Sequence, residues 1–248
     1  MVSQPQRVKR VVLVLLISGI TGVIAAGGGA APARDTGGVT VTGQVHYVGE
    51  LPATEQIPVD RDGAYCGDTM PNEALKVGQE SRGVAEVVIS LEGVPRVLPS
   101  REDAPLLIEN RTCRFLPRVN AMHSGRVLII SNADPVMHNT HIRKKSRFGE
   151  NLINVVQPPQ GKVEKPVKEP GFLDVRCDAH PFMWAAIHVF DHPYFAVTDG
   201  MGRFQLHHVP PGRYRLKVWH ETLRSLERII TVSSETPESI MIEVGPEV

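Results

Sequence analysis

The chain has 248 residues, balances 27 basic against 27 acidic side chains, and contains 22 glycines and 20 prolines. This balance leaves no basic stripe for binding nucleic acid and no acidic tail for docking. The frequent turn residues, together with the lack of a sustained 3.6-residue apolar period, favour an all-β protein of one large or two modest domains.

The N-terminus has the features of an export signal. A basic stretch, 7–10, precedes an uncharged apolar run, 11–26, and small residues with an A-x-A pattern follow up to Ala33. We expect residues 1–33 to be a signal peptide, so that the rest of the chain lies in the periplasm or elsewhere outside the cytoplasm. The alternative is an uncleaved membrane anchor, although the run is short for a span of about 20 residues.

The chain has three cysteines, which is an odd number. An oxidising compartment favours structural disulfides. Cys177 lies in a run of potential metal ligands, so Cys66 and Cys113 are the expected disulfide pair. The alternative is that both are free and buried.

Short alternating segments predict strands along most of the chain. The first is 39–47, where valines alternate with polar residues, and the second is 84–91. The other expected strands are 106–109, 118–122, 126–131, 172–177, 185–190, 195–198, 204–206, 213–218, 229–232 and 240–244. Charges and prolines predict a connector at 95–105, and 157–171, rich in proline and without periodicity, is expected to be a loop.

The motif with the clearest chemistry is Cys177-Asp-Ala-His180-Pro-Phe-Met183. Its thiolate, imidazole and thioether could surround one ion. A thiolate and imidazoles in a trigonal plane with a weak axial thioether are typical of electron-transfer copper. The second imidazole must come from elsewhere, and His138 and His141, which follow the expected strand 126–131, are the candidates.

These two segments resemble the cupredoxins, especially the amicyanin-like members. The run from Val136 to His141 and the loop 177–183 match two motifs of that family in order, and Pro170-Gly171-Phe172 is similar to its run before the cysteine strand. The resemblance covers 104–190 and implies a Greek-key cupredoxin β-barrel with one copper ion. The ligand set that it implies, with His138 in preference to His141, is His138, Cys177, His180 and Met183; Asn139 is expected to hydrogen-bond near the Cys177 sulfur.

The flanking segments resemble the transthyretin-type, carboxypeptidase regulatory-like β-sandwich. The resemblance rests on 195–204, with its Thr-Asp-x-x-Gly-x-Phe pattern, and on 209–214. It implies that 38–100 and 194–246 together form one β-sandwich into which the cupredoxin is inserted. The alternative is that the cupredoxin is flanked by separate consecutive modules.

The expected function is that of an exported type 1 copper protein that carries single electrons and is not an enzyme. The alternative is a module that binds, handles or senses copper without electron transfer, and zinc is an alternative ion for a Cys/His₂ site. No HExxH or Gly-x-Ser-x-Gly pattern is present. A redox protein of unknown identity is the expected partner, and membrane contact is expected only if the N-terminal segment is uncleaved.

The remaining histidines and Trp184 are given structural interpretations. His123 is expected in a solvent-exposed turn, His188 and His192 beside the strand after the ligand loop, and His207, His208 and His220 on the surface or in turns. Trp184 is expected to pack against the end of the barrel, and the alternative is contact with an electron-transfer partner.

Overall fold

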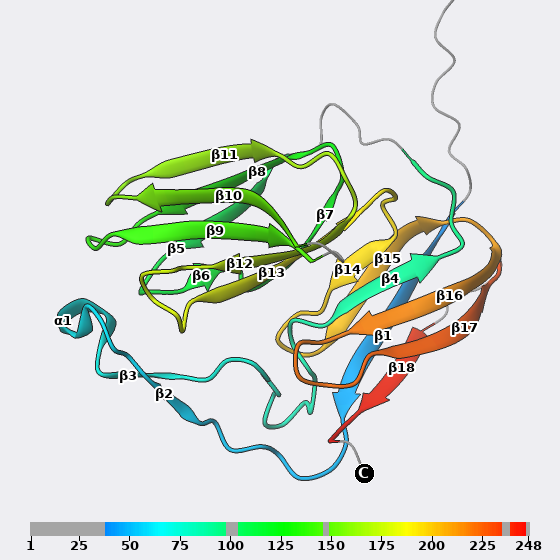
Figure 1. Ribbon diagram of the computed structural model, residues 1–248. Helices are drawn as coiled ribbons and strands as arrows, with labels where there is room; N and C mark the ends of the chain where they lie inside the picture. The colour runs from blue at the N-terminus through cyan, green and yellow to red at the C-terminus, as the bar shows by residue number, and fades with distance from the viewer. Residues whose placement is uncertain (1–37, 98–103, 146–148, 235–238, 247–248) are drawn as a thin grey trace, which may run out of the picture. The chain divides into compact units, whose positions relative to one another are not determined.

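The computed structural model describes residues 38–97, 104–145, 149–234 and 239–246. The expected signal segment, 1–33, lies outside them. Over the described residues the chain is built from strands, with a four-residue helix, α1 (Gly63–Cys66) (Figure 1). No helix of this part of the chain has the length and apolar character needed to cross a membrane. The expectation of an all-β protein is confirmed.

Strands from the two ends of the described chain form two sheets, here called the terminal sandwich. One sheet has the order β15 (Arg203–Val209), β1 (Val39–Tyr47), β18 (Ser239–Val244), and the other has the order β14 (Phe195–Val197), β4 (Val88–Glu92), β16 (Gly212–Trp219), β17 (Leu226–Val232). Alternate residues of β1 and β16 are buried, as period-2 patterning requires. Val41, Val45, Ile89 and Leu216 have no exposed surface and belong to one apolar cluster.

The middle of the chain forms two further sheets, here called the central sandwich. One has the order β10 (Glu150–Gln157), β9 (His138–Lys144), β12 (Gly171–Arg176), β13 (Trp184–Phe190), β7 (Val119–His123), and the other has the order β11 (Lys162–Pro166), β8 (Val127–Asn132), β5 (Leu106–Asn110), β6 (Phe115–Leu116). A second apolar cluster contains Ile108, Leu128 and Ile130 from one sheet and Ile142 and Leu173 from the other.

A segment between β1 and β4, residues 56–71, contacts the central cluster, and we call it the bridging segment. It consists of β2 (Gln56–Pro58), α1 and β3 (Thr69–Pro71), with β2 and β3 paired antiparallel. The side chains of Ile57, Val59 and Met70 pack in or against the central cluster. The predicted disulfide is confirmed: Cys66 of α1 is bonded to Cys113, with a Cα–Cα distance of 5.6 Å.

The prediction of a loop over 157–171 is wrong for residues 162–166. These residues form β11, which pairs antiparallel with β8 along the edge of its sheet. Exposed and half-buried residues alternate along β11, and none is fully buried. An edge strand of this kind can be polar on both faces, so it lacks the apolar alternation from which strands are predicted.

Two apolar clusters take their residues from different parts of the chain. Apart from Met70, the central cluster lies between Ile108 and Val189, whereas the terminal cluster combines residues from Val41 to Leu91 with residues from Tyr194 to Val244. The insertion of one domain into a transthyretin-like sandwich stays a prediction.

Candidate metal centre

The expected ligands come from neighbouring strands of one sheet. His138 begins β9, Cys177 directly follows β12, and the loop after Cys177 leads into β13 at Trp184. Strands β9 and β12 are paired, with Arg176 opposite His141. This pairing brings residues 39 positions apart in the sequence to the same end of the central sandwich.

The loop from Cys177 to Met183 closes on itself through backbone hydrogen bonds. The N–H of Cys177 donates to the carbonyl of Met183 at 3.4 Å, and the N–H of Met183 donates to the carbonyl of His180 at 2.9 Å. The loop therefore holds its three potential ligands at fixed positions relative to one another.

Three ligand atoms converge at this end of the sandwich. The Nδ1 atoms of His138 and His180 are 3.1 Å apart, and the Cys177 Sγ lies 3.6 Å from the Nδ1 of His180. One nitrogen from each ring and the sulfur all lie within 4.8 Å of one another. The three residues are at most 1 % exposed, and Met183, 2 % exposed, belongs to the same buried cluster as Cys177.

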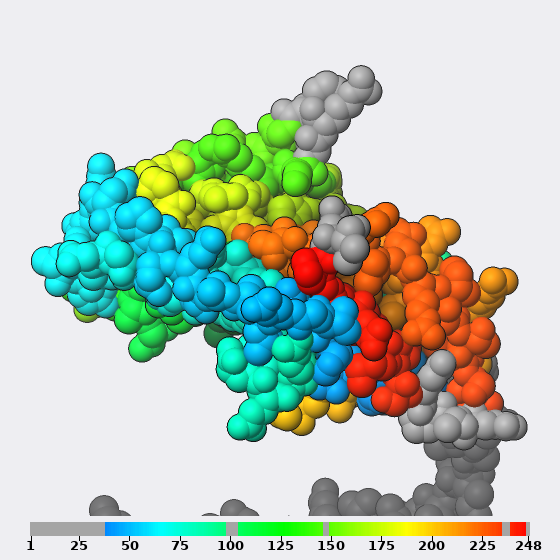
Figure 2. Space-filling view, turned by 90° about the horizontal axis from the view of Figure 1, so that it is seen from below, coloured from blue at the N-terminus to red at the C-terminus, as the bar shows by residue number. Residues whose placement is uncertain are grey.

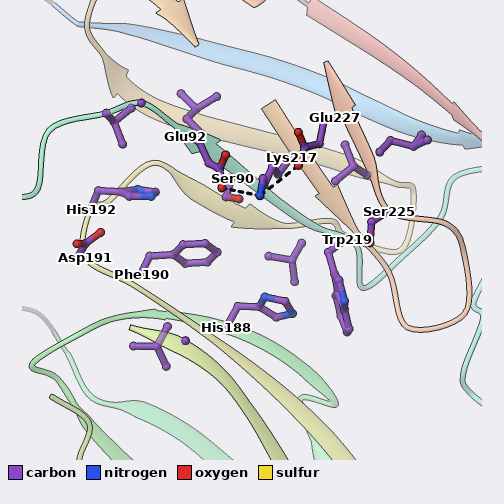
Figure 3. A pocket seen from close by; sticks show the side chains of 18 residues that line it. Ser90, Glu92, His188, Phe190, Asp191, His192, Lys217, Trp219, Ser225 and Glu227 are labelled. Atoms are coloured by element: carbon purple, nitrogen blue, oxygen red, sulfur yellow. Dashed lines mark ion pairs between the residues drawn. The ribbon is translucent and has the colours of Figure 1, made fainter. Parts of the chain in front are cut away.

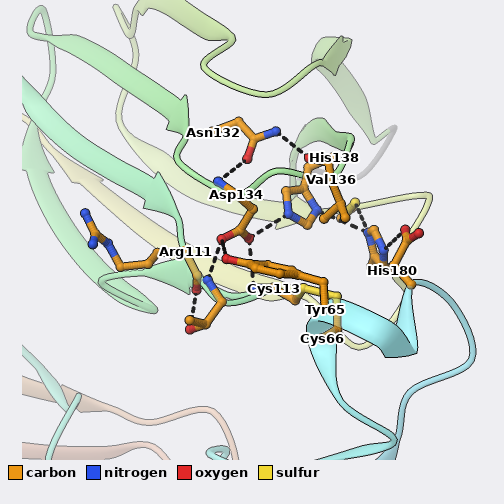
Figure 4. Close-up of a disulfide and its surroundings, with 12 residues drawn as sticks. Tyr65, Cys66, Arg111, Cys113, Asn132, Asp134, Val136, His138 and His180 are labelled. Atoms are coloured by element: carbon orange, nitrogen blue, oxygen red, sulfur yellow. Dashed lines mark hydrogen bonds and ion pairs between the residues drawn. A yellow bond between two sulfur atoms is a disulfide. The ribbon is translucent and has the colours of Figure 1, made fainter.

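A carboxylate faces the opposite nitrogen of each ring. The Nε2 of His138 lies 2.8 Å from Asp134, and the Nε2 of His180 lies 2.9 Å from Asp62 (Figure 4). An ionised carboxylate can only accept hydrogen bonds, so Nε2 is the protonated nitrogen in the neutral ring. The tautomer is inferred from these partners, and it leaves the Nδ1 of each ring as a lone pair.

These residues fit a single metal ion. Two Nδ1 lone pairs and the Cys177 sulfur face one another without a donor between the two nitrogens, an arrangement that a cation stabilises. Metal–nitrogen bonds of about 2.0 Å at a tetrahedral angle separate two nitrogens by about 3.3 Å. The observed separation is 3.1 Å. A ligand set of one thiolate, two imidazoles and a nearby thioether resembles a type 1 copper site.

Asp134 is held by several donors besides His138. It accepts hydrogen bonds from the Tyr65 hydroxyl at 2.8 Å and from the backbone N–H groups of Thr112 at 2.6 Å and Cys113 at 2.8 Å. Burial opposes the ionisation of Asp134, but these bonds outweigh it and lower the pKa of the carboxyl group. Asp134 therefore connects the ring of His138 to the bridging segment and to the disulfide.

Asn139 contacts the sulfur through its backbone. Its N–H donates to the Cys177 Sγ at 3.2 Å, its side-chain oxygen accepts from the N–H of Asp178 at 3.2 Å, and its amide nitrogen donates to Asn154 at 2.8 Å. Burial raises the pKa of the Cys177 thiol, and the Asn139 bond opposes that rise. Asn139 thus lies where the resemblance implied and links the strands that hold the ligands.

His141 lies outside the group of converging ligand atoms. It is 6 % exposed, with its Nδ1 3.0 Å from Asp178 and its Nε2 3.0 Å from Asn151. His141 and Asp178 form a polar contact beside the site. The structure therefore distinguishes the two candidate histidines: His138 faces Cys177 and His141 does not.

Two other histidines differ from their predicted environments. His123 is 5 % exposed, so the prediction of a solvent-exposed turn is wrong: β7 continues to His123, whose Nδ1 lies 2.8 Å from the Ser124 carbonyl. His220 does lie at a turn, but it is buried, and its Nδ1 accepts the N–H of Thr222 at 3.2 Å. Each ring has one nitrogen bonded to a local backbone group, whereas the Nε2 of His123 is buried without a hydrogen-bond partner among the described residues.

The last histidines and Trp184 agree with structural roles. His207 and His208 are exposed, as expected. The ring of His188 packs 4.3 Å from that of Trp219 and is not one of the converging ligands. His192 is buried and accepts the N–H of Tyr194. Trp184 donates its indole N–H to Asp174 at 2.6 Å, and the guanidinium of Arg118 lies 4.5 Å from its ring centre.

Sequence reasoning missed the two carboxylates of the site. Asp134 could have been found, because it precedes His138 by four residues in the motif from which the histidine was chosen. Asp62 lies 118 positions from His180, and no local pattern connects them.

A pocket elsewhere does not contain a comparable site. It is lined by Phe190, His192 and Trp219, among others (Figure 3). Its charged Lys217 is already paired with Glu92 at 2.6 Å and Glu227 at 3.2 Å. Because its charges are paired with one another, this pocket is not assigned a ligand.

Comparisons with known proteins find partial likenesses to copper proteins. No protein-family model matches the sequence, and the search among curated proteins finds no match. A copper-containing nitrite reductase from Thermus scotoductus SA-01 is 17% identical over 39% of this chain and 25% of its own, with a TM-score of 0.33. This chain therefore matches about a quarter of that enzyme's length.

Two small cupredoxins are similar over nearly their whole lengths. A variant of amicyanin in its reduced Cu(I) form is 14% identical over 41% of this chain and 98% of its own, with a TM-score of 0.32. A purple cupredoxin from Nitrosopumilus maritimus is 21% identical over 34% of this chain and 99% of its own, with a TM-score of 0.30.

Proposed function

We propose that this protein binds one copper ion at His138, Cys177, His180 and Met183 and carries single electrons between redox proteins. The observation that carries the proposal is the convergence of two Nδ1 atoms and one sulfur, each ring being fixed from its far side by a carboxylate. A bound copper ion supplies the redox chemistry by alternating between Cu(I) and Cu(II).

The residues of the chain have separate tasks in this proposal. The Cys177 thiolate and the Met183 thioether favour Cu(I), whereas the imidazoles of His138 and His180 accept both oxidation states. Asp62, Asp134 and the N–H of Asn139 hold these ligands in place by hydrogen bonds and tune the metal. Because these contacts come from the folded chain, the ligands need little rearrangement when the charge of the site changes.

The test is an optical and EPR spectrum of the copper-loaded full chain. We expect strong visible absorption from thiolate-to-Cu(II) charge transfer, lost in Cys177→Ser and strongly altered in His138→Ala. The matched control is His141→Ala, a buried histidine of the same strand that lies outside the converging ligands, and it should keep the band. A copper-loaded protein that stays colourless after oxidation would contradict the proposal.

Two further measurements separate electron transfer from other uses of the site. If the protein only handles or senses copper, a copper chelator removes the ion readily, and ferricyanide does not reversibly oxidise the reduced protein. Zinc in protein purified without added metal would point to a zinc site. The proposed carrier retains its copper through repeated one-electron cycles and is not an enzyme.

We place the protein outside the cytoplasm and regard its central sandwich as an insertion. The disulfide between Cys66 and Cys113 supports an oxidising compartment. The two apolar clusters, one drawn from both ends of the described chain, support the insertion. Limited proteolysis tests it: a single cut near residue 100 that releases an intact N-terminal piece would contradict it.

A further inference from the structure

The ring of His180 is covered by a part of the chain remote in sequence. His180 has no exposed surface, and its Nε2 bonds to Asp62 of the bridging segment at 2.9 Å. The Asp62 side chain is itself 39 % exposed. The Asp62 carboxylate therefore lies between the Nε2 of His180 and solvent.

Three further contacts hold the bridging segment at the site. The disulfide joins Cys66 to Cys113, the Tyr65 hydroxyl bonds to Asp134, and Met70 is buried in the central cluster. Figure 4 shows α1 beside these residues, with Tyr65 extending toward Asp134 and Cys66 toward Cys113. The two carboxylates that orient the imidazoles are thus both bound to this segment, one as its own residue and one through Tyr65.

The backbone presents Asp62 at a defined place. Asp62 precedes α1 in a left-handed conformation, with φ of 54°, and its carbonyl accepts the N–H groups of Tyr65 and Cys66 at 2.9 Å each. The disulfide cysteine is therefore four residues from Asp62 in the same hydrogen-bonded turn. Fixing Cys66 also fixes Asp62, since only one turn of backbone lies between them.

The outer face of the bridging segment faces solvent. Asp62, Ala64, Tyr65, Gly67 and Asp68 are all exposed. Figure 2 shows blue-to-cyan atoms of this part of the chain as a continuous surface on the face viewed. On its inner side Met70 is buried, and Ile57, Val59 and Cys66 are half-buried.

We infer that residues 56–71 form a disulfide-held cover over the His180 edge of the metal site, and that Asp62 is the positioning residue that holds the His180 ring. The inference rests on the proposed function for its meaning but concerns contacts of the chain itself. The cover fixes the ring plane of His180 and prevents water, small ligands or a partner from reaching its Nε2. An electron that enters or leaves the site at the His180 edge must then pass through the cover.

The first experiment needs no copper. Diethyl pyrocarbonate acylates accessible imidazole nitrogens, and mass spectrometry locates the modified histidines in the metal-free full chain. In the unmodified protein we expect His180 to be protected relative to the exposed His207. In Asp62→Ala, the labelling rate of His180 should rise about tenfold, the factor that corresponds to losing one net hydrogen bond.

Two variants make the result specific. Asp60→Asn removes a charge two positions away, on an exposed residue of the same segment, and should leave His180 protected. Removing both disulfide cysteines, in Cys66→Ala/Cys113→Ala, should release the cover and also raise the labelling. If the double variant does not fold, Asp62→Ala still decides the matter, because Asp62 is a surface residue whose loss leaves the apolar cluster intact.

The second experiment uses the copper-loaded protein. We expect a higher reduction potential in Asp62→Ala than in the unmodified protein, because a negative charge bonded to a ligand favours Cu(II). In Asp62→Asn, which keeps an acceptor oxygen but loses the charge, the potential should rise while His180 stays largely protected. A merely structural role would move both readouts together.

The outcomes separate the cover from the proposed function. The inference is overturned if His180 is labelled as fast as His207 in the unmodified protein, or if Asp62→Ala leaves the labelling unchanged. If His180 is protected but the copper-loaded protein is colourless, the cover stands and the electron-carrier proposal fails.

Discussion

The two sandwiches bury different kinds of side chain. In the terminal sandwich the cluster is aliphatic and aromatic, and the buried polar residues of that part of the described chain are Ser90, Thr198 and His220. In the central sandwich many more polar residues are buried beside the apolar cluster, among them Asn110, Asn132, Asp134, His138, Asn139, Thr140, His141, Gln157 and His180. Burying a polar group costs free energy unless it is hydrogen-bonded.

The central sandwich meets this cost with a connected network. Asn132 donates to the carbonyl of Val136 at 2.9 Å and to that of Gln157 at 3.0 Å, and the side chain of Gln157 donates to the Ile130 carbonyl at 2.9 Å. These bonds fix the segment that leads to His138. The comparison teaches that most buried polar groups lie in the sandwich that contains the candidate site, whereas the other sandwich is packed mainly with apolar side chains.

The largest effect is expected from removing the centre of that network. Asp134→Ala leaves the Nε2 of His138 and three other donors without their acceptor. We expect the free energy of unfolding of the metal-free protein to fall by about 4 kcal/mol, measured by urea denaturation. Asp134→Asn keeps one acceptor oxygen and should lose less. A loss below about 1 kcal/mol, the value of an exposed ion pair, would contradict the comparison.

A somewhat smaller effect is expected from a cavity in the terminal sandwich. Leu216→Ala removes a side chain with no exposed surface and should lower the free energy of unfolding by about 3 kcal/mol. Because Leu216 belongs to the other cluster, the visible spectrum of the copper-loaded protein should not change. The control is Ile229→Ala on the neighbouring strand, where the side chain is 49% exposed. A shifted copper spectrum in Leu216→Ala would show that the two sandwiches are not independent.

The smallest effect concerns a buried polar group of the terminal sandwich. Burial, helped by the charge of Arg118, lowers the pKa of His220 to about 4. The unfolded chain, with a histidine pKa of about 6.5, binds more protons between these values, so stability is lost as the pH falls from about 6.5 to 4. Between pH 7 and pH 4.5 the loss attributable to His220 is about 2 kcal/mol.

Denaturation at pH 7 and pH 4.5 measures this loss. His220→Asn keeps an acceptor for the Thr222 N–H but does not titrate, so its stability should change less between the two pH values. His207→Asn, at an exposed position, should behave like the unmodified protein. An equal pH dependence in His220→Asn and the unmodified protein would show that His220 is not an important proton-linked group.

Strands that bury apolar residues at alternate positions could be predicted from sequence, at sheet edges as well as inside a sheet: the expected strands 204–206, 229–232 and 240–244 correspond to β15, β17 and β18. The prediction of 39–47 matches β1 because valines alternate there with polar residues. Strands β9 and β10 were not predicted, and β11 was taken for a loop. The residues that β9 buries are mostly polar, β10 buries Gln157 but exposes Val156, and β11 has no fully buried residue. Burial of apolar residues leaves a pattern in the sequence, whereas a strand that buries polar residues, or none, leaves little.

The site followed the same rule. Three candidate ligands could be predicted from the segment 177–183, because residues close together in a short loop also lie close together in space. The partner of each imidazole depends on tertiary structure: Asp134 lies near His138 in sequence, but Asp62 reaches His180 only through the bridging segment. The candidate ligands could therefore be predicted from local motifs, whereas the full set of groups that orient them could not.

The closed loop between Cys177 and Met183 has a consequence for affinity. Its backbone bonds fix three donors before any ion arrives, so the conformational entropy of arranging them is lost during folding and not during binding. A metal ion that bound here would find these three ligand atoms already arranged. Lengthening the loop by one residue would displace His180 and Met183 together, which makes its length as much a determinant of the site as its side chains.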